Sequence, residues 1–113
     1  MNITMNLSDK YFNLLNKGIK DIEVRLLDEK RSKIKTGDII TFTNSTNSIN
    51  TIVKNIIIFS NINDLLCNID PNRIGLSTNK ELAKKEISSI YSEDKLSKFK
   101  VIAIEIKRIS DKH

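Results

Sequence analysis

The fold can be read outward from the segment GIKDIEVRLL, Gly18–Leu27. From Lys20 to Leu27, apolar side chains at Ile22, Val24 and Leu26 alternate with charged ones at Asp21, Glu23 and Arg25. A period of two is typical of a half-buried strand, with one face on a core and the other in water. Glu23 and Arg25 are therefore expected on one face, within reach of each other or of a shared ligand.

A short helix is predicted before this strand, over Ser8–Lys17. Ser8 is a good N-cap, and apolar residues follow at helical spacing. Lys17 and Gly18 are typical of a helix end. Lys20 has the opposite parity to Glu23 and Arg25, so it joins them only if it lies in the turn between helix and strand or on a bulge.

The middle of the chain predicts an exposed connection and then a hairpin. Residues 28–35 are charged and have room for one helical turn. The runs Ile39–Asn44 and Ile49–Phe59 are rich in β-branched and aromatic residues and flank a polar tip. Within the second run, Ile56–Ile58 is continuously apolar, which predicts burial on both faces.

The sequence after the hairpin predicts short helices. Asn61 or Asn63 is expected to cap a helix that places Cys67 in the core, and Pro71 and Gly75 are expected to break the chain.

A longer helix and a closing strand are expected next. Thr78 and Glu81 have capping-box spacing. The apolar residues that follow share one helical face: Leu82, Ala83, Ile87, Ile90 and Tyr91. Val101–Ile109 alternates as a last strand with one wet face. Strands and helices in this order predict a mixed α+β fold with a small curled sheet or barrel.

Composition limits the function classes. The chain has 113 residues, a net charge of +5, one cysteine and one histidine, His113. This size suits a single domain over residues 1–113. A lone thiol and a terminal histidine exclude a disulfide framework and disfavour metal sites and His-based catalysis. The apolar runs are too short to cross a membrane, and the first residues do not resemble a signal peptide. The sequence therefore predicts a cytoplasmic protein that does not associate with a membrane.

The basic charge permits a polyanionic partner. However, Lys far outnumbers Arg, and Ile and Asn are common, as AT-rich coding would produce without any selection for binding.

The spacing Gly18-x-Lys20-x-x-Glu23-x-Arg25, between a short helix and a strand, resembles the signature of the ASCH domain family. The resemblance extends through residues 28–31, the turn at 35–38 and the closing strand, and so covers nearly the whole chain. It is closest to the small single-domain bacterial type. The resemblance implies a PUA-like curled β-barrel of about five to six strands with short helices at its ends.

The resemblance also implies a function: binding RNA or a (modified) nucleoside or nucleotide in a cleft beside the barrel, without a cofactor or metal. The motif residues Gly18, Lys20, Glu23 and Arg25 are expected at that cleft. Further candidates come from their position or side-chain type: Asp28, Lys30 and Arg31, which follow the strand and are placed to line the mouth of the cleft, and Asn44, whose amide is able to contact a ligand. Tyr91 and Phe99 are able to stack a base, although core packing is the favoured interpretation for both.

The chemistry of the segment supports such a site. Arg25 presents a planar fork to phosphate or carboxylate, Lys20 supplies a cation or, if desolvated, a base, and Glu23 accepts hydrogen bonds or moves a proton. The competing interpretation is a solvated strand face, on which Glu23 and Arg25 form a surface pair worth about 0–1 kcal/mol. Residue types alone favour the surface pair, and the family resemblance favours the site.

Three further functions remain open. The first is a small amidohydrolase that removes the acetyl group from N-acetylated cytidine, with Lys20 and Glu23 catalytic. Similar enzymes have Thr at the position of Glu23 and a carboxylate in the segment matching 74–78, which is absent here; Asp70 or Glu81 would have to replace it. The second is a metal-free ribonuclease. The third is a protein-interaction domain, which would need an exposed apolar patch.

Overall fold

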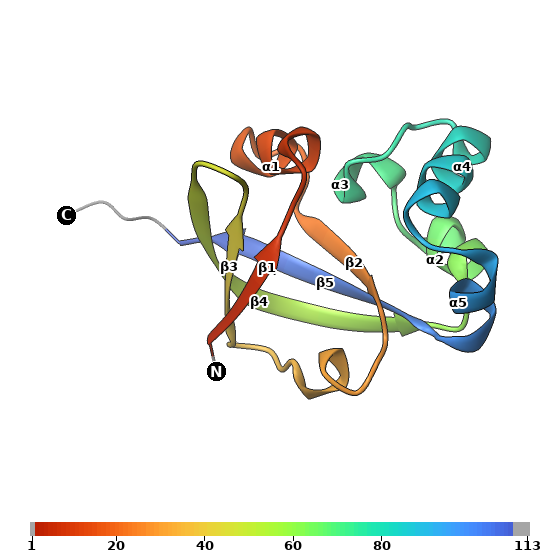
Figure 1. Cartoon of the computed structure of the whole chain (residues 1–113), viewed down its shortest axis with the longest axis horizontal. Coiled ribbons are helices and arrows are strands. Elements are labelled where there is room, and N and C mark those ends of the chain that lie inside the picture. Colours follow the sequence, from red (N-terminus) through yellow and green to blue (C-terminus); the bar gives the residue numbers. More distant parts are fainter. Residues whose placement is uncertain (1, 110–113) are drawn as a thin grey trace.

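A computed structural model describes residues 2–109, so His113 lies outside the described residues. Five strands form one sheet: β1 (Asn2–Asn6), β2 (Ile22–Leu26), β3 (Ile39–Thr43), β4 (Ser48–Phe59) and β5 (Val101–Arg108). Their order is β1-β3-β4-β5-β2, with β1 parallel to β3 and the other pairs antiparallel. The sheet curls into a half-barrel whose two edge strands are β1 and β2 (Figure 1). The fold is α+β, as predicted.

Short helices occupy the connections. They are α1 (Asp9–Asn16), the 3₁₀ turn η1 (Arg31–Lys33), α2 (Ile62–Asn68), α3 (Pro71–Ile74), α4 (Lys80–Ile90) and α5 (Glu93–Lys98). The helices α2 to α5 gather beside one end of the sheet, and α1 lies apart from them (Figure 1). Between Asn2 and Ile109, no helix is both long and apolar enough to cross a membrane.

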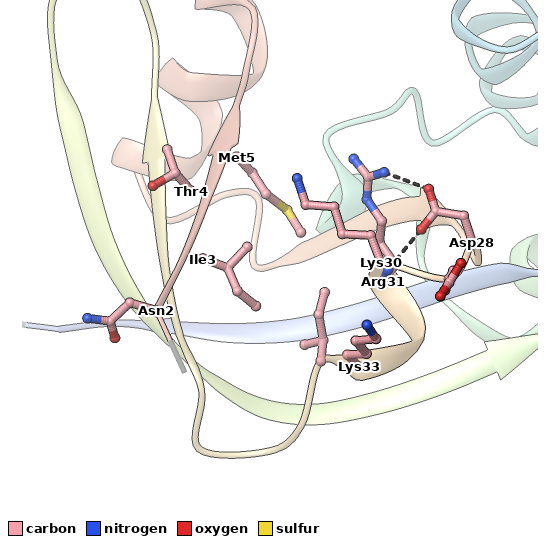
Figure 2. Close-up of a pocket in the computed structure, with 10 residues that line it drawn as sticks. Asn2, Ile3, Thr4, Met5, Asp28, Lys30, Arg31 and Lys33 are labelled. Atoms are coloured by element: carbon pink, nitrogen blue, oxygen red, sulfur yellow. Dashed lines mark hydrogen bonds and ion pairs between the residues drawn. The ribbon is translucent and has the colours of Figure 1, made fainter.

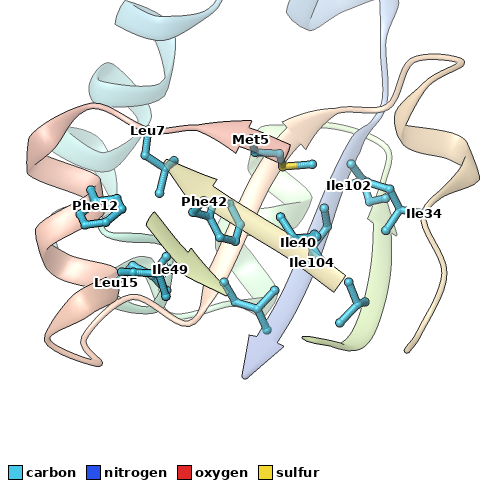
Figure 3. Close-up of a cluster of buried hydrophobic side chains, with 12 residues drawn as sticks. Met5, Leu7, Phe12, Leu15, Ile34, Ile40, Phe42, Ile49, Ile102 and Ile104 are labelled. Atoms are coloured by element: carbon cyan, nitrogen blue, oxygen red, sulfur yellow. The ribbon is translucent and has the colours of Figure 1, made fainter. Parts of the chain in front are cut away.

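Two apolar clusters form the core. The first packs α1 against the concave side of the sheet, where Phe12 and Leu15 lie near Phe42 and Ile49 (Figure 3). The second lies under α2, α3 and α4 and includes Leu65 and Ile87. The strand β5 separates the two clusters, because its successive side chains point alternately into the first cluster and into the second. Residues 102, 104 and 106 face the first cluster, and residues 101 and 103 face the second.

This arrangement corrects the expected wet face of β5 in the first half of the strand, whereas Glu105 and Lys107, on the same side, are half-buried and exposed. Ala103 is only 2% exposed, because helices cover the side of the strand that alternation alone assigns to water. The same geometry decides the face of β2. Glu23 lies opposite Ile104 in the sheet, so it points to the side of the first cluster, although its side of β2 was expected to be wet.

Several local predictions are confirmed. The helix predicted over Ser8–Lys17 is α1, the strand within Gly18–Leu27 is β2, and the predicted hairpin is formed by β3 and β4. Asn61 caps α2 by accepting a hydrogen bond from the Asp64 N–H.

The prediction that Ile56–Ile58 is buried on both faces is wrong. Ile57 is 42% exposed and Ile58 is 52% exposed. The cause is the length of β4, which is paired with β3 only as far as Ile52. Beyond that point β4 has a neighbour on one side only and no layer that covers it fully.

Other local expectations are also wrong. Cys67 is exposed, not core-filling. By contrast, Pro71 and Gly75 interrupt the helices as expected: Pro71 follows the end of α2 and begins α3, where a missing N–H costs nothing, and Gly75 ends α3. The cap of α4 is Asn79, whose side chain accepts from two backbone N–H groups, and not Thr78. Phe99 is 37% exposed, so it is not a core residue.

The apolar face of α4 is covered only in part. Ala83 and Ile87 are buried, but Leu82 and Ile90 are half exposed. The strand β1 and the helix α5 were not predicted. The sequence of β1, NITMN, alternates but holds only two apolar residues, and that of α5, EDKLSK, holds only one.

Candidate functional site

Lys20 is the most buried charged residue of the site, with 2% of its surface exposed. Its Nζ donates to the carbonyl oxygens of Ile22 at 2.7 Å and Ile74 at 2.8 Å, and it lies 2.8 Å from Glu23 Oε1. An ammonium group has three N–H donors, and three acceptors surround it here. Lys20 is therefore fully engaged with the protein and holds Glu23 in place.

Glu23 is 5% exposed, and both of its carboxylate oxygens face a cation. Oε1 pairs with Lys20, and Oε2 accepts a hydrogen bond from Arg25 Nε. Burial alone would raise the pKa of Glu23, but the nearby charges of Lys20 and Arg25 outweigh burial and hold this pKa below its usual value. Glu23 is thus a buried ionised carboxylate, and the surface-pair interpretation of Glu23 and Arg25 does not hold.

Lys20 reaches Glu23 because it precedes β2 instead of lying in it. Gly18 adopts φ +80° after α1, and the Leu14 carbonyl accepts the backbone N–H groups of Ile19 and Lys20. This tight turn releases Lys20 from the alternation of the strand. The structure therefore brings Lys20, Glu23 and Arg25 together, and we call these three residues the charged triad.

The Ile74 carbonyl that supports Lys20 is held by an ion-pair network. Arg73 donates to both carboxylate oxygens of Asp21 at 2.9 Å and to Glu105 Oε2 at 2.8 Å. The Arg73 carbonyl also accepts from the Asp21 N–H at 2.9 Å. These contacts fasten α3 to the start of β2. They explain how a residue 54 positions away in the sequence becomes a partner of Lys20.

The charged triad forms one side of a hollow of about 260 Å³, which we call the triad pocket. Its other walls are mostly apolar or aromatic. Beside the triad, the lining residues are Asn6, Leu7, Ser8, Tyr11, Val24, Ile74, Leu76, Ile87, Ile90 and Tyr91. Tyr11 and Tyr91 are the only tyrosines of the chain, and the Tyr11 ring centroid lies 6.0 Å from Lys20 Nζ. Burial raises the pKa of Tyr91.

A second hollow of about 670 Å³ runs between β1 and the connection that follows β2; we call it the seam groove (Figure 2). It is lined by Asn2–Met5, by residues 28–31, and by Lys33 and Ile34. Asp28, Lys30 and Arg31 therefore line this groove and not the mouth of the triad pocket. Arg31 donates to Asp28 through its backbone N–H at 2.8 Å and its guanidinium at 2.7 Å, and the backbone bond is the main reason that the pKa of Asp28 is lowered.

Gly18 and Asn44 line neither hollow. Gly18 acts through the backbone turn after α1. The Asn44 side chain accepts from the backbone N–H groups of Thr46 and Asn47 at the hairpin tip and donates to Asp9. Asp70 and Glu81 do not line the triad pocket either: Asp70 caps α3, and Glu81 is exposed. Among residues 2–109, no three His, Cys, Asp or Glu side chains group as metal ligands.

The sequence did not identify the walls of the triad pocket. Tyr11 and Ile87 have helical spacing that is equally typical of core residues, and a period does not reveal which part of an apolar face stays uncovered. The half-exposed Ile90, one turn after Ile87, is the visible sign that α4 extends beyond the core.

Comparisons with known proteins agree with this geometry. The family model of the ASCH domain matches residues 5–110. The crystal structure of hypothetical protein PH0355 is similar, with a TM-score of 0.85, 35% identity, and coverage of 96% of this chain and all of that one. The solution NMR structure of protein PF0455 from Pyrococcus furiosus has a TM-score of 0.72, 29% identity, and coverage of 97% and 99%. No curated protein matched.

The fold and the site thus define a small PUA-like domain, a curled half-barrel sheet with short helices. The chain belongs to the ASCH domain family. This family is often linked to RNA binding. The expected family and fold class are confirmed, while the bacterial type stays a prediction.

Proposed function

We propose that this protein acts in the cytoplasm and binds RNA or a nucleoside by holding one base, natural or modified, in the triad pocket. The observation that carries the proposal is a buried ionised carboxylate, Glu23, on the wall of an otherwise apolar pocket. Ligand sites combine apolar walls with a few fixed polar groups in this way. The volume of about 260 Å³ lies below the range typical of drug-sized ligands and suits one base or nucleoside.

The polar groups suit the edge of a base. An ionised carboxylate only accepts hydrogen bonds, so Glu23 selects an amino or imino N–H. Arg25 is 18% exposed and, beside its bonds to Glu23 and to the Asn6 carbonyl, offers further N–H donors to a carbonyl or ring nitrogen. A base whose edge carries a hydrogen-bond donor next to an acceptor is therefore complementary to Glu23 and Arg25. The aromatic rings of Tyr11 and Tyr91 supply stacking surfaces that accept any base.

The contacts of Lys20 favour binding over catalysis. A lysine that takes part in a reaction must present its Nζ to the substrate, but two backbone carbonyls and the Glu23 carboxylate already surround this nitrogen. Among residues 2–109, Glu23 is the only carboxylate that lines the pocket, and its lowered pKa disfavours proton donation. The amidohydrolase and the ribonuclease are therefore less well supported. The interaction domain has exposed Ile57 and Ile58 in its favour but does not require a charged pocket.

The test is binding of free nucleosides, followed by calorimetry and by NMR of the tyrosine rings. Because both tyrosines of the chain line the pocket, their ring signals report on it directly. We expect one or more nucleosides with an amino edge to shift both sets of signals. Arg25→Ala should weaken this binding about tenfold or more, the loss expected for a charge-assisted hydrogen bond.

The matched controls separate recognition from folding. Glu81→Gln changes an exposed carboxylate that lines neither hollow and should bind as the wild type does. It also tests the amidohydrolase alternative, in which Glu81 replaces the missing acid. Release of cytidine from N-acetylated cytidine by the wild type, lost in Glu81→Gln, would favour that enzyme. No shift of the tyrosine signals with any nucleoside would contradict the proposal.

A further inference from the structure

The triad pocket and the seam groove lie along the same gap between the edge strands β1 and β2. On β1, Asn2–Met5 line the groove and the next residue, Asn6, lines the pocket. On the other side, Arg25 lines the pocket, and the groove begins at Asp28, just after β2. Arg25 Nη2 donates across the gap to the Asn6 carbonyl at 3.0 Å, so this hydrogen bond lies where the two hollows meet.

The cationic side chains of the seam groove differ in whether they form an ion pair. Arg31 is paired with Asp28. Lys30 and Lys33 form no ion pair within the described part of the chain. Figure 2 shows the Lys30 side chain extending toward β1, whereas the Arg31 guanidinium turns toward Asp28. The groove is therefore lined by two lysine side chains without a neutralising carboxylate. Its apolar lining is formed by Ile3, Met5 and Ile34.

We infer that the seam groove binds the sugar-phosphate backbone beside the base held in the triad pocket, so that the ligand is a single-stranded RNA segment and not a free nucleoside. This inference rests on the proposed function of the triad pocket. Lys30 and Lys33 neutralise phosphates, and the apolar floor receives a ribose or a neighbouring base. A single strand is required because only an unstacked base is free to enter the pocket.

The charge of the groove favours a nucleic acid over the other candidate, an extended peptide paired with the free edge of β1. Three cations and two carboxylates, Asp28 and Glu29, line the groove, and the chain as a whole carries a net charge of +5. A peptide would need the backbone groups of β1 and no particular charge. A nucleic acid uses the two free lysines and the adjoining base pocket together.

The experiment compares two kinds of ligand and two double variants. The ligands are the four natural nucleosides and the hexanucleotide RNA built from each of them, all measured between about 50 and 200 mM salt. The first variant is Lys30→Ala with Lys33→Ala. The control is Lys54→Ala with Lys85→Ala, which removes the same charge from exposed positions that line neither hollow.

We expect the wild type to bind the hexanucleotide at least tenfold more tightly than the nucleoside. The Lys30/Lys33 variant should lose that gain and bind the nucleoside normally. Its plot of log affinity against log salt should be less steep by about 1.4, since each phosphate contact on a single strand contributes about 0.7. The Lys54/Lys85 variant should show a much smaller change of slope.

The outcomes distinguish the groove from the pocket. If the Lys30/Lys33 variant binds the hexanucleotide with wild-type affinity and salt dependence, the inference is overturned while nucleoside binding stands. If no nucleoside binds but hexanucleotide binding depends on Lys30 and Lys33, the base pocket fails and the groove is upheld. Equal binding of a DNA hexanucleotide would overturn the choice of RNA, because nothing would then read the 2′-hydroxyl.

Discussion

Lys20 and Glu23 form a buried ion pair, with 2.8 Å between Nζ and Oε1 and with the two side chains only 2% and 6% exposed. The pair costs desolvation energy, and its surroundings compensate for this cost. Two carbonyls complete the shell of Lys20, Arg25 binds the second oxygen of Glu23, and no buried side-chain nitrogen or oxygen in the described structure lacks a partner. Such a pair is rigid, and it keeps a negative charge fixed at the edge of the pocket.

Removing the charge of Glu23 should strongly destabilise the protein. Glu23→Gln leaves the Lys20 ammonium buried without its anion, and breaking a buried pair typically costs about 3–5 kcal/mol. The free energy of unfolding in urea at neutral pH measures the loss. Glu81→Gln, on the surface, should change it by less than about 0.5 kcal/mol. A loss as small as that of the control would show that Glu23 is hydrated.

The pair should also behave as a unit in a double-mutant cycle. Lys20→Met removes the ammonium and leaves a buried carboxylate that only Arg25 neutralises. Combining it with Glu23→Gln removes both charges at once, so the double variant should be less destabilised than the sum of the single variants. We expect a coupling of about 1–3 kcal/mol from urea denaturation. Simple additivity would mean that the two side chains do not interact.

The stability of the protein should decline in acid, partly because of Glu23. Its pKa in the folded protein is lowered from an ordinary value of 4.5, so Glu23 stabilises the fold above pH 4.5. This contribution is lost as the pH falls from there through the lower folded value. Unfolding measured from pH 7 to pH 3 should therefore be less pH-dependent in Glu23→Gln than in the wild type. Part of the dependence should remain, because the pKa of Asp28 is lowered too.

A side chain at Gly75 should destabilise the protein more than a side chain at another glycine with positive φ. It has φ +94°, and a Cβ there would lie 3.1 Å from Tyr11 Cδ1 and 3.3 Å from Lys20 Cδ. Gly37 is the matched control, with φ +93° and nothing within 4 Å of an added Cβ. Gly37→Ala should cost about 1–2 kcal/mol for its backbone conformation alone, and Gly75→Ala about 1–3 kcal/mol more because of crowding. Equal losses in thermal unfolding would show that Tyr11 and Lys20 move aside easily.

The sequence predicts where helices and strands form better than it predicts which of their faces other segments bury. The alternation of β2 and the helical spacing of α1 are short-range patterns, and the structure confirms both. The exposure of Ile57 and the burial of Ala103 depend on which distant segment covers each strand face. Local patterning does not contain that information.

The candidate site shows the same division. Spacing alone places Glu23 and Arg25 on one face, and the turn at Gly18 permits Lys20 to join them. The Ile74 carbonyl and the wall formed by α4 come from distant parts of the chain, so they emerge only in the folded structure. The family resemblance identified the charged segment, but not the separation of the triad pocket from the seam groove.

The most direct measurement is a crystal structure of the protein grown with the nucleoside that binds best. The account predicts the base between the apolar walls of the triad pocket, with an N–H of its edge within hydrogen-bond distance of a Glu23 carboxylate oxygen. A nucleoside bound elsewhere, or a base in the pocket that makes no contact with Glu23 or Arg25, would contradict it.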